Sequence, residues 1–65
     1  MAIEIEREID GRILAAVPGL PGVMAYGATE AEALGNVTAI ARRILADMVE
    51  SGEELPAGLD GLLAD

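Results

Sequence analysis

The sequence contains no cysteine, no histidine and no lysine, and its single aromatic residue is Tyr26. Without cysteine the chain has no disulfide framework, no thiolate zinc site and no sign of an oxidising compartment. Catalysis near neutral pH usually needs a nucleophile beside a base such as histidine or lysine, and this chain offers one serine, Ser51. We therefore expect a protein that is not an enzyme and that binds no cofactor or metal ion.

The sequence also lacks a long uninterrupted apolar run. The longest apolar stretch, ILAAVPGLPGVMA at residues 13–25, holds two prolines and is shorter than the roughly 20 residues that a bilayer requires. The first residues, MAIEIERE, are acidic where a signal peptide is basic. These features predict a cytoplasmic protein that does not enter a membrane.

Positive charge is scarce. Twelve acidic residues face four arginines, which gives a formal net charge of -8. Direct binding to nucleic acid is not expected, because neutralising phosphates requires clustered lysine and arginine. The charge favours a basic protein partner, although it also serves simply to keep a small apolar chain in solution.

The chain is short for a stable domain. A protein of 65 residues buries only about 60% of the surface that its unfolded chain exposes. Small domains usually gain further stability from disulfides, a metal ion or oligomerisation. The composition leaves association with other chains, so we expect a homo-oligomer, a dimer or larger.

Residues 3–9, IEIEREI, alternate apolar and acidic side chains apart from Arg7 and predict a half-buried strand, with Ile3, Ile5 and Ile9 on one side. Asp10-Gly11 predicts a hairpin turn into a second strand at 12–17. A two-residue loop would pair Ile5 with Ala16. A three-residue loop at 9–11, with Gly11 left-handed, pairs Ile5 with Ala15 and gathers the apolar side chains on one face. We prefer the second register, which leaves Leu14 on the opposite, acidic face.

The segment VPGLPG at 17–22 predicts a compact corner, and residues 23–28 predict a third strand. Gly27 is interpreted as the point where the chain leaves the sheet. Thr29 and Glu32 have the spacing of a capping box, and apolar residues then recur at helical spacing up to a stop at Ser51-Gly52. The residues expected to shape turns and caps are Gly11, Pro18, Pro21, Gly22, Gly27, Thr29, Glu32 and Gly52.

These elements predict an α+β fold, a three-stranded antiparallel meander followed by one long helix on one face. A helix of about 22 residues is about 33 Å long, whereas strands of about six residues span about 20 Å. The C-terminal turns of the helix should therefore extend beyond the sheet and need a cover. We favour a second copy of the chain, and the candidate self-association residues are Ile44, Leu45, Met48, Val49 and Leu55. In that assembly the tail, residues 53–65, would contribute a short fourth strand or an oligomerisation arm. The alternative is that the tail folds back through Leu55, Leu59, Leu62 and Leu63.

The acidic row on the first strand has two interpretations, an oxygen-rich cation site or a solvated outer face that meets a partner. Tyr26 also has two, an anchor in an interface or a lid over the start of the helix. The candidate partner-facing residues are Glu4, Glu6, Glu8, Leu14 and Tyr26.

The order of elements, together with Pro18-Gly19-Leu20-Pro21-Gly22, Gly27 with Thr29, and Glu32-Ala33 with Asn36, resembles the HicB-like antitoxins of bacterial toxin–antitoxin pairs. The resemblance covers residues 3–52 and assigns 1–52 to the domain. It implies a partial ribonuclease-H-like fold without ribonuclease activity, which binds and blocks a small basic toxin that cleaves messenger RNA. It does not extend to the DNA-binding domain that family members usually carry. The alternative is an orphan homo-oligomeric accessory domain with no toxin.

Overall fold

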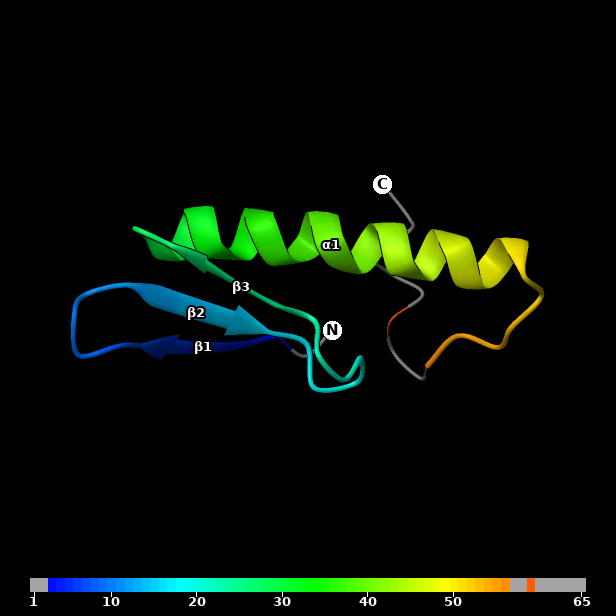
Figure 1. Cartoon of the computed structure of the whole chain (residues 1–65), viewed down its shortest axis with the longest axis horizontal. Helices are drawn as coiled ribbons and strands as arrows, with labels where there is room; N and C mark the ends of the chain where they lie inside the picture. Colours follow the sequence, from blue (N-terminus) through cyan, green and yellow to red (C-terminus); the bar gives the residue numbers. More distant parts are fainter. Residues whose placement is uncertain (1–2, 57–58, 60–65) are drawn as a thin grey trace.

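The computed structural model describes residues 3–56 and residue 59, and it has an α+β fold (Figure 1). Strands β1 (Glu4–Arg7), β2 (Ile13–Ala16) and β3 (Met24–Gly27) form an antiparallel sheet in the order β1-β2-β3. Helix α1 (Glu30–Glu50) follows and lies along one face of the sheet, over β3 and β2. The predicted meander with one long helix on one face is confirmed.

The hairpin between β1 and β2 has the three-residue loop. Ile5 pairs with Ala15, the amide of Glu8 donates to Arg12 O at 2.8 Å, and Gly11 has a φ of 94°. Gly11 is therefore the left-handed residue of a G1 bulge, as the apolar pattern predicts. Ile9 lies in this loop and is fully exposed, so the alternation of the strand does not place it on the apolar side.

The corner between β2 and β3 consists of two successive turns. The amide of Leu20 donates to Val17 O and that of Val23 donates to Leu20 O, each at 3.0 Å. The second turn needs a positive φ at its third residue, and Gly22 supplies it with 82°. Because Leu20 is buried between the two turns, the corner is fixed to the core rather than projecting into solvent.

Both ends of α1 follow the sequence signals. Thr29 Oγ1 accepts a hydrogen bond from the amide of Glu32 at 3.1 Å, and the Glu32 carboxylate accepts from the amide of Ala28 at 2.9 Å, one residue before the usual partner of a capping box. At the other end Gly52 has a φ of 77°, its amide donates to Val49 O, and the amide of Glu53 donates to Met48 O. This pair of bonds is a Schellman motif, which ends the helix.

The structure assigns Gly27 a second role beside the one the sequence suggested. Gly27 is the last residue of β3, where it pairs with Ile13, and the chain leaves the sheet after it. It is buried, and a Cβ at this position would overlap Ala33 N and lie 2.9 Å from Ala33 Cα. A side chain is therefore excluded by the close approach of the backbone of α1.

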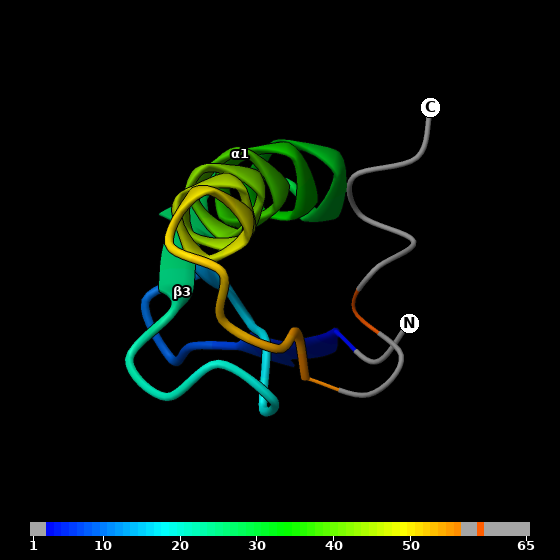
Figure 2. The same cartoon turned by 90° about the vertical axis from the view of Figure 1, so that its right-hand side faces the viewer.

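The core lies between the sheet and α1 (Figure 2). Leu45 is 0% exposed and Leu59 is 3% exposed, and both belong to this core. A Cβ on Gly19 would lie 3.0 Å from Leu59 Cδ1, so Leu59 packs directly on the corner between β2 and β3. The expectation that Leu45 is exposed for a second chain therefore does not hold, and the alternative in which the tail folds back is found for Leu55 and Leu59. Leu62 and Leu63 lie outside the described residues.

Candidate protein-interaction face

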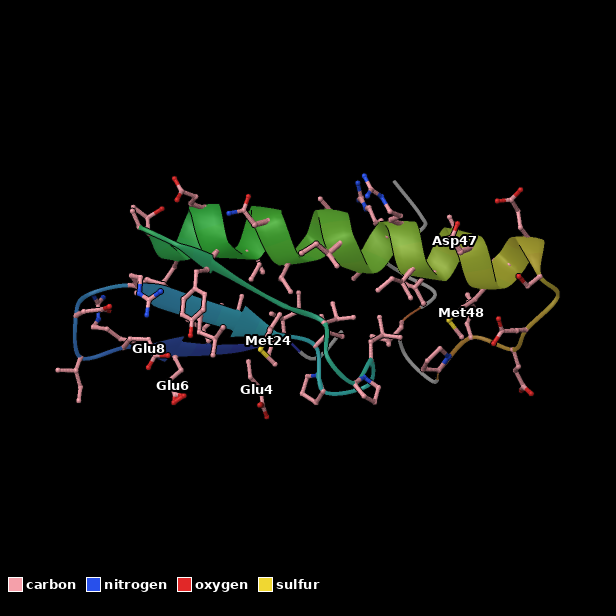
Figure 3. All side chains as sticks on the ribbon, viewed as in Figure 1. Glu4, Glu6, Glu8, Met24, Asp47 and Met48 are labelled. Carbon is pink, nitrogen blue, oxygen red and sulfur yellow. The ribbon has the colours of Figure 1, made fainter. Side chains whose placement is uncertain are left out.

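One face of the sheet is left uncovered by α1, and we call it the outer face. The register brings alternate residues of the three strands together there, with Glu6 opposite Leu14 and Leu14 opposite Tyr26. The glutamates of β1 point away from α1 in Figure 3. The outer face comprises Glu4, Glu6, Glu8, Arg12, Leu14, Ala16, Met24 and Tyr26, and it includes every candidate partner-facing residue predicted from the sequence.

The apolar part of this face lies on β2 and β3. Met24 is 51% exposed and Tyr26 is 42% exposed, while Leu14 between the strands is half-buried. Met24 was not predicted from the sequence, although it has the same parity as Tyr26 in a strand and could have been found from that spacing. An exposed apolar patch with a polar or charged rim is a feature of protein-binding surfaces.

A polar network occupies the end of the outer face nearest the hairpin loop. The hydroxyl of Tyr26 donates to the carboxylate of Glu8 at 3.1 Å, and the guanidinium carbon of Arg12 lies 4.3 Å from the centroid of the Tyr26 ring. Arg12 also pairs with Asp10, with 2.8 Å between Nε and Oδ2. Tyr26 is therefore held against β1 and β2 and does not form the lid over the helix N-terminus that was the alternative.

The network shifts the pKa values of Tyr26 and Asp10 in opposite directions. The hydrogen bond to Glu8 and the negative charge of that residue raise the pKa of Tyr26 above its ordinary value. The hydrogen bond from the backbone amide of Arg12, followed by that from its side chain, lowers the pKa of Asp10. Both groups are on the surface, so these shifts describe the electrostatics of the face rather than a buried reactive group.

The candidate self-association residues are not brought together as one exposed patch. Ile44, Met48 and Leu55 are half-buried and pack against the core. Val49 is 54% exposed. In Figure 3 Met48 points from α1 towards the segment that returns after Gly52, whereas Asp47 points away from it.

Other kinds of site find little support in the part of the chain that the structure describes. Within residues 3–56 and residue 59, no polar or charged side chain is buried and no group of three or more potential metal ligands comes together. Glu8, Ile9, Asp10 and Arg12 line a shallow depression that is open to solvent. No helix in the same residues is long and apolar enough to cross a membrane.

Comparisons with protein-family models, with curated proteins and with solved structures found no match to this chain. The function is therefore inferred from the residues and their geometry, together with the sequence resemblance stated above.

Proposed function

We propose that this chain is a cytoplasmic protein-binding domain of the antitoxin type, which neutralises a small basic toxin that cleaves messenger RNA. The observation that carries the proposal is the outer face, where Glu4, Glu6 and Glu8 share one surface with the exposed side chains of Met24 and Tyr26 across β2. A row of carboxylates attracts a basic surface and sets its orientation. The apolar side chains supply the area that excludes water from the contact.

The overall charge supports the same function. A net charge of -8 attracts a basic ribonuclease over several ångströms before contact and repels RNA. A domain of this kind inhibits by covering the RNA-binding surface of the toxin and requires no catalytic group of its own. The HicB-like resemblance supports this mode of action and also implies a partial ribonuclease-H-like fold.

Co-expression with a basic protein encoded beside this gene tests the proposal. The chain should restore growth and form a complex that purifies intact. Glu6→Arg should weaken the complex by about 30-fold or more, since it places repulsion at the centre of the face. Glu50→Arg changes the net charge equally but lies at the end of α1, so it should stay within about threefold. If no neighbouring toxin is neutralised, or if both variants weaken binding equally, the proposal fails.

The second candidate is a homo-oligomeric accessory domain with no toxin. The observation that favours it is the set of exposed apolar side chains on α1, where Leu34 is 42%, Ile40 is 41% and Val49 is 54% exposed. Sedimentation at low micromolar concentration distinguishes the two, because a folded monomer would remove this candidate. If a dimer is found, Met48→Asp should dissociate or unfold it by setting an unpaired charge against the apolar end of α1.

A further inference from the structure

The two edges of the sheet are not equally open. On β3, the carbonyl oxygen of Tyr26 accepts a hydrogen bond from Asn36 Nδ2 of α1 at 2.9 Å, and α1 lies over that strand. On β1, no strand of the described residues pairs with the outward side. Figure 2 shows β1 on the side of the sheet away from α1. The edge formed by β1 is therefore the one available for a further strand.

The hydrogen bonds of the hairpin show which backbone groups are free on that edge. The amide of Glu8 donates across to Arg12, so Glu8, Glu6 and Glu4 direct their backbone groups towards β2. Antiparallel pairing alternates along a strand, which means that Ile5 and Arg7 direct their N–H and C=O groups outwards. An unpaired row of this kind is a template for strand addition.

The side chains of β1 select the strand that can be added. On the outer face Glu4 and Glu6 of β1 form a row with Glu8, which follows the strand, and on the opposite face Ile5 is 40% exposed. A second copy of β1 would bring glutamates next to glutamates across the new pair, which is destabilising. A strand that carries positive charges on one face and an apolar residue on the other complements both faces.

We propose that β1 accepts an extended antiparallel strand from a basic protein, with lysine or arginine at alternate positions facing Glu4, Glu6 and Glu8 and an apolar residue beside Ile5. The inference rests on the proposed function, because it specifies how the basic partner is held. Residues opposite Ile5 and Arg7 exchange backbone hydrogen bonds with them. Residues opposite the glutamates form the non-hydrogen-bonded pairs, where Cα atoms are only about 4.5 Å apart and side chains interact most closely.

A synthetic peptide of alternating lysine and valine tests this without any toxin. Its control has the same composition in blocks, so that lysine no longer recurs at every second position. The alternating peptide should bind at least about tenfold more tightly than the control, and added salt should weaken the binding of the alternating peptide. It should also slow hydrogen exchange at the amides of Ile5 and Arg7, which are outward-facing. Equal affinity for the two peptides, or unprotected amides at Ile5 and Arg7, overturns the proposal.

Two substitutions at Arg7 distinguish the contribution of its backbone N–H to peptide binding from the contribution of its side chain. Arg7 is exposed, and both Arg7→Ala and Arg7→Pro remove its charge. Arg7→Pro also removes the outward N–H, and an edge strand tolerates proline there. Arg7→Pro should weaken the alternating peptide by about tenfold relative to Arg7→Ala. Equal affinities of two variants with unchanged folds overturn strand addition.

The result is independent of whether a toxin is found. If the peptide behaves as expected but no neighbouring protein is neutralised, the strand-binding edge stands and the antitoxin function fails. If a toxin is neutralised while the peptide and the Arg7 pair show no preference, the function stands and the partner is held by the outer face alone.

Discussion

The two faces of the sheet differ in what holds them together. On the face that meets α1, the packed side chains are apolar, and the backbone of Gly27 lies against that of Ala33. On the outer face, Tyr26 bonds to Glu8 and stacks with Arg12, all at the surface. The face that meets α1, the inner face, determines the stability of the fold, and the outer face is free to determine which partner binds. Substitutions on the outer face should therefore leave the free energy of unfolding unchanged, and substitutions on the inner face that preserve the fold should leave partner binding unchanged.

The largest effect on stability is expected at Gly27, where α1 packs most closely against the sheet. Gly27→Ala places a Cβ against backbone atoms of α1, which can yield only if the helix moves off the sheet. We expect a loss of about 3 kcal/mol or more in the free energy of unfolding, which is a large share of the total stability of a domain of this size. Circular dichroism during urea denaturation measures it.

The control is the same change on the open side of α1. Gly35 is exposed and has no atom within 4 Å of an added Cβ, so Gly35→Ala should stabilise the protein by about 0.5–1 kcal/mol through helix propensity. If Gly27→Ala lowers the free energy of unfolding while Gly35→Ala raises it, the close packing of α1 on β3 is supported. Similar changes in that free energy at both positions would contradict it.

The next effect concerns the end of α1 that extends beyond the strands. Leu45→Ala removes a side chain that is 0% exposed and should cost about 2–5 kcal/mol. Val49→Ala, at a site that is 54% exposed, should change the free energy of unfolding by less than about 0.5 kcal/mol. Denaturant titration compares the two variants. A loss of more than about 0.5 kcal/mol for Val49→Ala would indicate that a second chain buries the side chain of Val49.

A smaller effect is expected at the start of α1. Thr29→Ala removes the oxygen that accepts from the amide of Glu32 and should cost about 1 kcal/mol. Thr29→Ser keeps the acceptor and should retain nearly all of the stability. Thermal unfolding followed at several concentrations of protein measures both. If Ser and Ala behave alike, the hydroxyl does not cap the helix.

Local patterns were sufficient to predict much of the fold. The pairing of Ile5 with Ala15 followed from the alternation of apolar residues. The capping roles of Thr29 and Gly52 were predictable because the hydrogen bonds at the helix ends span only a few residues. These features are predictable because the atoms that decide them are close in the sequence. The acidic row and Leu14 on the outer face followed from the same alternation.

Features that depend on distant contacts were not predictable in this way. Gly27 was assigned a local role, whereas the backbone of Ala33 requires it to be glycine. Leu45 was assigned to a contact with a second chain, whereas it is buried in the core of one chain together with Leu59, which packs on Gly19. Each case depends on the angle at which elements pack, which no sequence period encodes.

The smallest expected effect is a change in the pKa of Tyr26, which tests the polar network of the outer face alone. Tyr26 is the only tyrosine and the chain has no tryptophan, so the ultraviolet absorbance of the phenolate reports this residue directly. Because the hydrogen bond and charge of Glu8 raise its pKa, the folded protein should titrate above the ordinary value of 10.0. The stabilising contribution of the neutral phenol is present below the pKa of the unfolded chain and is lost as pH rises through the higher folded value. Glu8→Gln should bring the pKa back towards that of the unfolded chain, while Glu4→Gln, farther along the same strand, should leave it unchanged. Identical titrations for the two variants would mean that Tyr26 does not contact Glu8 and that the network at the hairpin end of the outer face is absent in solution.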